Sequence, residues 1–265
     1  MRRAVPSRLR TAPSGSSASI SQELQVVAAL HEIGADLGDP VEVTRSGGQV
    51  LVSGMGIAPA RQKEIHRVLD PIPNVAVQFA APPPAPDAPA TTATPLGGAR
   101  PGTMQARFEQ QLGGRAEFAR FSAQILDWNE AAMARSYALR ALAQRFSADA
   151  VASLSAPDRG VLTAMAREHL AAMAGNVTSI QRTLAPVLVS LGGETAQGRP
   201  VTAVPTWQDA AESLFQAARR VELLLASALG VTQESGVSDR IPSDLMTALT
   251  DLRANLEQSE RLLPQ

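Results

Sequence analysis

The sequence predicts an α+β protein in which a small mixed domain precedes a longer helical domain. Three observations support this class. A stretch rich in proline and small residues, 81–103, interrupts the 265-residue chain, and such a composition favours an extended linker without a core. Short runs of alternating apolar residues, typical of strands, occur before this stretch. After it, apolar residues recur at spacings of three and four, the period of an amphipathic helix.

Residues 21–80 are expected to form the element order αββαβ, with the helices packed on one face of the sheet. Ser21 can cap a first helix, and Asp39–Pro40 should stop it. The apolar stripe of that helix is Val26, Leu30, Ile33 and Leu37. Two alternating runs separated by two glycines then indicate a β-hairpin. Pro59 suits the first turn of a second helix, and a third strand is expected from Val75.

Residues 104–265 are expected to be helical. Four apolar stripes predict helices near 115–146, 158–191, 207–229 and 243–263. One heptad-like stripe in each segment favours packing at shallow angles, as in an antiparallel, coiled-coil-like four-helix bundle. The first two segments are joined by about ten residues, which pairs them as a long antiparallel hairpin.

Signals at the helix ends support these boundaries. Ser155 and Thr206 each stand three residues before a carboxylate, as capping residues at a helix N-terminus do. Gly192 and Gly230 follow apolar stripes, where a helix end needs a left-handed residue. Pro186 lies within the second long stripe, and we therefore expect a kink or an early helix end there.

One charged residue interrupts the apolar stripe of the first long helix. Arg135 can pack its aliphatic stem while its guanidinium reaches solvent or pairs with a Glu on a neighbouring helix. The alternative is a polar site that sets the helix register or contacts an anion. On the same stripe, Phe121, Ile125 and Trp128 are expected to face the second helix.

Composition excludes several kinds of site. The chain has no Cys and three His, so disulfides, thiolate chemistry and multi-histidine metal centres are not expected. A formal charge of -1 and an aromatic content of 3% do not favour nucleic acid as a partner. No run of about 18 apolar residues predicts a membrane helix. Residues 1–20 are rich in Arg and small residues and lack an apolar core, which predicts a disordered tail and no signal peptide.

No residue is assigned a catalytic, cofactor-binding or metal-binding role from the sequence. His31, His66 and His169 are expected on three different helices. The first two could meet within the small domain, but no clear carboxylate partner joins them, so surface or half-buried positions are the simpler interpretation. The third histidine is expected on the flank of its helix.

Two further patterns are interpreted as structural. The acidic residues of the small domain gather near one end of the expected sheet: Glu32, Asp36, Asp39 and Glu42. They lack the loop spacing and central glycine of a calcium site, so a solvated face is expected. Gly54-Met55-Gly56 follows a strand but lacks the third glycine of a dinucleotide-binding turn.

The small domain resembles the BON family, the bacterial osmotic-stress and nodulation module. The resemblance covers a strand over 50–54 that ends in a glycine, a helix over 58–70 and a last strand that begins near Val75. Asn74 stands where the family has a glycine, and Asn also tolerates a left-handed turn. The resemblance implies an αββαβ fold that binds phospholipid surfaces or other envelope components and has no catalytic residues.

Segments 29–38 and 127–140, with the proline-rich stretch between them, are similar to the C-terminal extracytoplasmic region of bacterial transmembrane anti-sigma-factor-like proteins. Those proteins also carry a zinc-binding cytoplasmic domain and a membrane helix, which this sequence lacks. The resemblance implies either a free-standing, cytoplasmic relative or an extracytoplasmic part of a longer membrane-anchored protein.

The sequence therefore predicts a non-enzymatic bacterial interaction module, associated with the cell envelope or with signalling. All basic residues except Lys63 are Arg, a bias typical of GC-rich bacterial coding regions. The expected partner is a protein, or a second copy bound through the helical bundle. Weak contact with a membrane surface is conceivable for the BON-like domain, although residues 21–80 carry seven acids against four bases. A self-assembling coiled-coil scaffold and an enzyme with an unrecognised site are the two alternatives. No cofactor is expected.

Overall fold

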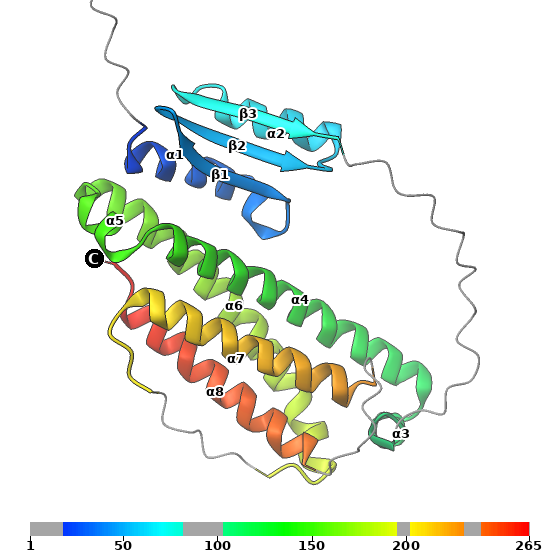
Figure 1. The fold of residues 1–265 in the computed structure, drawn as a ribbon. Helices are drawn as coiled ribbons and strands as arrows, with labels where there is room; N and C mark the ends of the chain where they lie inside the picture. The colour runs from blue at the N-terminus through cyan, green and yellow to red at the C-terminus, as the bar shows by residue number, and fades with distance from the viewer. Residues whose placement is uncertain (1–17, 82–102, 195–201, 231–239, 265) are drawn as a thin grey trace, which may run out of the picture. The chain divides into compact units, whose positions relative to one another are not determined.

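The computed structural model describes residues 18–81, 103–194, 202–230 and 240–264, and within them the protein is predominantly helical with one small sheet, an α+β fold (Figure 1). The expected tail at 1–20 and the linker at 81–103 lie almost wholly outside the described residues. The chain divides into two compact units. The small unit contains residues 1–35 and 39–82, and the helical unit contains residues 36–38 and 83–265.

The small unit has the expected element order. Its elements are α1 (Ile20–Glu32), β1 (Val41–Ser46), β2 (Gln49–Met55), α2 (Pro59–Leu69) and β3 (Val75–Ala80), and a 3-10 turn over Ala35–Leu37 follows α1. The strands lie in the order β1-β2-β3. The first two form an antiparallel hairpin, and α2 crosses over so that β3 pairs parallel to β2.

The first helix begins and ends earlier than the sequence analysis predicted. Ser19, not Ser21, is the cap: its hydroxyl accepts from the N–H of Gln22, and the Gln22 side chain accepts from the N–H of Ser19. This capping box satisfies two backbone donors at once. The helix ends before Ile33 because Gly34 adopts a left-handed φ of 67°. Ile33 and Leu37 therefore fall outside α1.

One face of the sheet is covered and the other is open. Helix α1 contacts β1, β2 and α2, and α2 contacts β3. Val43, Val50 and Val52 are buried on the covered face, since alternate residues of a strand point the same way. The opposite face carries Glu42 and Gln78, which are exposed.

The described residues of the helical unit form two short and four long helices. They are α3 (Thr103–Leu112), α4 (Arg115–Arg145), α5 (Ala148–Ser153), α6 (Ala156–Ser190), α7 (Trp207–Ala228) and α8 (Ile241–Arg261). The long helices correspond to the four expected segments and lie side by side in Figure 1: α4 packs against α6 and α7, and α8 packs against the same two helices. The two short helices were not predicted separately.

The apolar stripes of the last two helices form their buried faces. Every apolar stripe residue within α7 and α8 is buried, and so is Leu263, which follows α8: Trp207, Ala211, Leu214, Ala218, Val221, Leu225, Ala228, Leu245, Leu249, Leu252, Leu256 and Leu263. Ser259, the polar member of the last stripe, is also buried, and its hydroxyl donates to the carbonyl of Ala210. The buried hydroxyl therefore has a hydrogen-bond acceptor, as buried polar groups usually do.

The predicted caps are confirmed. The Ser155 hydroxyl accepts from the N–H of Asp158, and the Thr206 hydroxyl accepts from the N–H of Asp209. Gly192 and Gly230 adopt positive φ angles of 90° and 73° after the helix ends. A capping hydroxyl and a left-handed glycine therefore mark the two ends of both α6 and α7.

Two expectations about the helix interiors are revised. Of the kink or early end expected at Pro186, the early end is wrong, because helix α6 runs through Pro186 to Ser190; Pro186 is exposed. On α4, Ile125 is fully buried, but Phe121 and Trp128 are only half-buried and Asn129 is buried beside them. The buried face is therefore rotated slightly from the predicted stripe, because the helical period of 3.6 drifts from a strict heptad.

Candidate functional site

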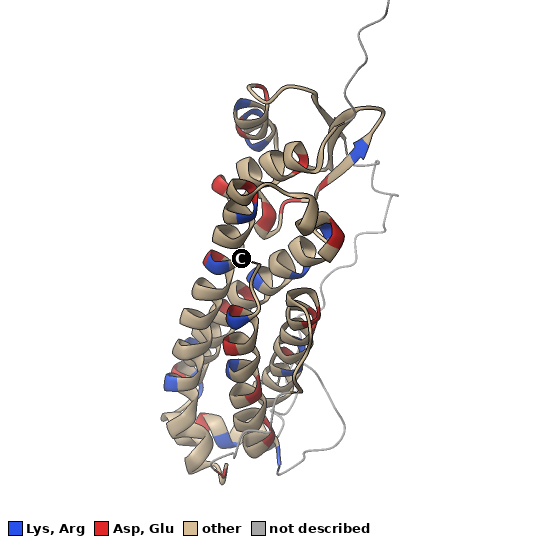
Figure 2. Cartoon of the chain, turned by 90° about the vertical axis from the view of Figure 1, so that its left-hand side faces the viewer, with Lys and Arg blue, Asp and Glu red and all other residues tan. Residues whose placement is uncertain are grey.

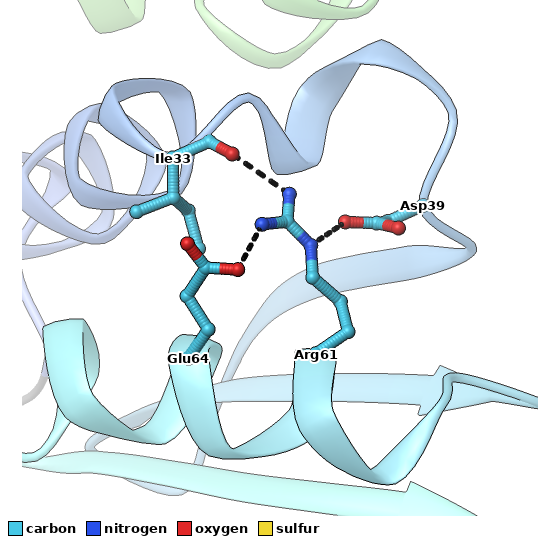
Figure 3. Close-up of polar contacts among 4 residues, drawn as sticks. All are labelled: Ile33, Asp39, Arg61 and Glu64. Atoms are coloured by element: carbon cyan, nitrogen blue, oxygen red, sulfur yellow. Dashed lines mark hydrogen bonds and ion pairs between the residues drawn. The ribbon is translucent and has the colours of Figure 1, made fainter.

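Arg61 is the centre of a hydrogen-bonded cluster in the small unit (Figure 3). Its Nε donates to Oδ2 of Asp39 at 2.6 Å, its Nη1 donates to Oε2 of Glu64 at 2.5 Å, and its Nη2 donates to the carbonyl of Ile33 at 2.8 Å. Each nitrogen of the guanidinium thus has an acceptor. The cluster joins α2 to the end of α1 and to the segment before β1.

The charged groups of this cluster are paired with one another. The hydrogen bonds from Arg61 to Asp39 and Glu64 raise the pKa of the guanidinium, so Arg61 is charged throughout the accessible pH range. The sequence analysis placed Asp39 on a solvated acidic face, which is wrong, because its side chain is only 25% exposed and is paired with Arg61. Glu32 and Glu42 are exposed as expected. The cluster serves as a structural clamp, because its charges already satisfy one another.

The histidines lie in different surroundings. Nδ1 of His66 is 3.3 Å from Oδ1 of Asp70, one turn along α2, and the imidazole meets the ring of Phe79 edge-on at 5.5 Å. His31 lies half-buried in the last turn of α1. His169 was expected on a helix flank, but its residue exposure is 1%, so that expectation was wrong.

Arg135 pairs across helices, as its simpler interpretation predicted. Its Nη1 lies 3.5 Å from Nδ1 of His169 and 3.9 Å from Oε1 of Glu168, both on α6. The Arg135 side chain is 23% exposed, whereas that of Glu168 is 64% exposed. The guanidinium therefore reaches the rim of the core, where part of its charge stays hydrated.

A shallow pocket lies at one end of the sheet in the small unit. It has a volume of about 390 Å³ and is lined by Pro40, Glu42, Ser53, Gly54, Met55, Gln78, Phe79 and Ala80. Glu42 is the register partner of Ser53, and Ser53 is the partner of Gln78. A carboxylate, a hydroxyl and an amide therefore form one row across all three strands.

Gly54 shapes this pocket. A Cβ at this position would lie 2.4 Å from Cδ1 of Ile57 and 3.2 Å from Cδ1 of Phe79, distances at which a neighbour must move. The glycine is therefore required by close packing. Gly56 adopts a φ of 72° and ends the strand, so the Gly54-Met55-Gly56 pattern is explained without a nucleotide.

The outer edge of β3 presents free hydrogen-bonding groups. The N–H of Val50 donates to the carbonyl of Asn74, and the N–H of Gly56 donates to that of Ala80. In a parallel pair of strands, every second residue of a strand directs both its N–H and its C=O toward the same neighbouring strand. Val75, Val77 and Phe79 therefore direct theirs to the other edge, along which no described strand pairs.

The helical unit carries an aromatic and charged cluster between α4 and α7. Tyr137, which is 49% exposed, meets the buried ring of Phe215 at 4.8 Å. The guanidinium of Arg140 stacks over the same ring at 4.4 Å, and its Nε donates to Oε2 of Glu212 at 2.5 Å. The hydrogen bond from Gln216, together with that from Arg140, lowers the pKa of Glu212.

Acidic and basic residues are mixed along the described helices (Figure 2). Across the described ranges, no helix combines the length and apolarity required to cross a membrane. The informative features are thus local: the pocket row and the β3 edge.

Comparison with known proteins found no match to a family model, a curated protein or a solved structure. The BON-like and anti-sigma-factor-like resemblances therefore rest on the residues quoted for them. Sequence analysis missed Ser53 and Gln78 as possible binding residues. Their signal, a polar side chain on the same face of each strand, becomes visible only with the strand register.

Proposed function

We propose that this chain is a non-enzymatic interaction protein whose small unit binds an extended segment of a partner protein by strand addition to β3. The observation that carries the proposal is the outer edge of β3, where no described strand pairs with the backbone N–H and C=O groups of Val75, Val77 and Phe79. Such an edge is a template for another strand.

The composition of β3 supports this function. Its six residues, VAVQFA, include no charged residue and no proline, the features that usually protect an edge strand from pairing. The other edge strand, β1, carries Glu42 and Arg45, and Arg45 forms an ion pair with the buried Glu23. The two edges of the sheet thus differ, and β3 is the one suited to pairing.

The wider interpretation rests on the same elements. We infer that the small unit is BON-like, which its element order supports, and that α4, α6, α7 and α8 form an antiparallel four-helix bundle, which their pairwise packing supports. A protein partner fits better than an anionic lipid surface, because residues 21–80 carry seven acids against four bases. Envelope or signalling association remains part of the proposal through the two resemblances.

The test uses the full chain and synthetic peptides. Peptides that bind the full chain are first selected from a displayed library. Each is then synthesised in two forms, one with N-methyl groups on the odd-numbered amides and one with N-methyl groups on the even-numbered amides. Strand addition uses only every second amide of the peptide, so one set should weaken binding by about tenfold or more and the other should not. Backbone NMR should place the bound peptide at Val75, Val77 and Phe79.

Two results would overturn the proposal. Equal effects of both methylated sets would exclude pairing through one edge, and a peptide footprint elsewhere would exclude β3. Light scattering on the same preparation distinguishes this proposal from the self-assembling scaffold, because a self-assembling coiled coil should form a stable oligomer without any peptide.

A further inference from the structure

The pocket at the end of the sheet combines one negative charge with apolar walls. Its polar row is Glu42, Ser53 and Gln78, one residue from each strand. Pro40, Met55, Phe79 and Ala80 surround that row. No Lys or Arg among the described residues lines the pocket, so no described residue of its wall neutralises Glu42.

Three acids of the small unit, unlike Glu42, are held in ion pairs with arginine. Glu23 pairs with Arg45, and Asp39 and Glu64 both pair with Arg61. Glu42 is exposed and forms no ion pair with any described residue. Its carboxylate is therefore accessible to an external group.

We propose that this pocket binds an alkyl guanidinium or alkyl ammonium group. The cation would pair with the Glu42 carboxylate in a charge-assisted hydrogen bond. Its remaining donors would bond to the side-chain oxygens of Ser53 and Gln78. The aliphatic stem would lie against Met55, which is 56% exposed.

Charge complementarity selects this ligand class over others. An anion would meet the Glu42 carboxylate with no basic residue in the wall to offset repulsion. A neutral polar ligand would form the hydrogen bonds but lose the charge-assisted bond, which is roughly twice as strong. The volume of about 390 Å³ lies in the range of small-ligand pockets.

The pocket shares Phe79 with the β3 edge, but its polar row uses the side chains of Glu42, Ser53 and Gln78 rather than the outer backbone groups of β3, so its test is separate from that of strand addition. NMR titration of the full chain with agmatine, a small guanidinium amine, should shift the amides of Glu42, Ser53 and Gln78. In a Glu42→Gln variant the agmatine affinity should fall about tenfold. Glu32→Gln, an exposed acid that does not line the pocket, is the matched control and should bind as the parent chain does.

A variant that should bind agmatine more tightly is included, because misfolding could explain a loss of binding but not a gain. Gln78→Glu places a second carboxylate in the row, and agmatine should then bind more tightly than it binds the parent chain. Unchanged affinity in both Glu42→Gln and Gln78→Glu would overturn the proposal, as would shifts confined to residues outside the pocket.

A second arm identifies the source of the cation. An acetylated, amidated Gly-Arg-Gly peptide and its citrulline counterpart, which is neutral, are titrated beside agmatine. Glu42-dependent binding of the arginine peptide above that of agmatine assigns the site to a side chain of a partner. Glu42-dependent binding of agmatine alone assigns it to a free amine. Binding of the citrulline peptide equal to that of the arginine peptide would contradict the proposed cation.

Discussion

Nε of Arg61 donates a 2.6 Å hydrogen bond to Oδ2 of Asp39, which lies 22 residues earlier in the sequence. The bond links the second helix of the small unit to the segment that leads into β1. Pro40 follows Asp39 directly, Glu42 stands three residues after it, and both line the pocket, so this bond also helps to position one wall of the proposed site.

Removing the Arg61 side-chain donors should destabilise the small unit. In Arg61→Met the carboxylates of Asp39 and Glu64 and the carbonyl of Ile33 lose their donor, which should cost about 1–3 kcal/mol. Amide hydrogen exchange of β2 measures this loss. Trp128 and Trp207 both lie in the helical unit, so the tryptophan fluorescence transition in urea should stay unchanged.

Arg67→Met is the matched control, because Arg67 is exposed on the same helix. Its effect on exchange should be close to zero. Equal effects of the two substitutions would contradict the structural role assigned to the Arg61 cluster.

Close packing around Gly54 makes a second prediction. Gly54→Ala should destabilise the small unit by about 1–3 kcal/mol, because the new Cβ would lie 2.4 Å from Cδ1 of Ile57. Ile57→Val removes that atom. The double variant should therefore lose less stability than the sum of the two single variants, as measured by exchange of the β2 amides. Simple additivity would show that Ile57 moves aside without cost.

The fold was more predictable than the site because its signals are local. The hairpin glycines, Pro59 and the caps at Ser155 and Thr206 act within a few residues of their positions in the chain. The error at the first helix had a local signal too: Ser19 stands three residues before Gln22 and can form a capping box, whereas Ser21 has Leu24 at that distance.

Arg135 tests whether a charge at the rim of the core contributes to stability. Its nearest carboxylate, on Glu168, is 64% exposed and 3.9 Å away, and exposed ion pairs contribute about 0–1 kcal/mol. We therefore expect Arg135→Leu to change the free energy of unfolding by no more than about 1 kcal/mol in a urea titration. A loss of about 3 kcal/mol or more would instead identify a buried polar site that depends on the guanidinium.

The lowered pKa of Glu212 predicts that the stability of the helical unit depends on pH. Its pKa is lowered by the hydrogen bonds from Gln216 and Arg140, so its stabilising effect is present above its usual pKa of 4.5 and is lost as the pH falls through the lowered value. The parent chain should be more stable than Glu212→Gln at about pH 7, and the difference should shrink by about pH 3. Urea unfolding followed by tryptophan fluorescence measures both.

Glu130→Gln provides the control for that experiment, since Glu130 is exposed on α4. A stability difference between the parent chain and Glu212→Gln that stays constant over this pH range would show that the carboxylate charge of Glu212 is not responsible.

The pocket row could not be predicted from the sequence, because it depends on long-range pairing. Glu42 was noted only for its charge, and Ser53 and Gln78 have no local feature that marks them. They become neighbours because β2 and β3 pair in parallel across the α2 crossover, and a shift of one residue in that register would move Gln78 to the other face.

The most direct test of the account is amide hydrogen exchange along β3 in the full, unliganded chain. If the outer edge is open, the amides of Val75, Val77 and Phe79 should exchange quickly, and those of Ala76, Gln78 and Ala80, which face β2, should be protected. Uniform protection of all six amides would mean that the edge is already covered, and would contradict strand addition at β3.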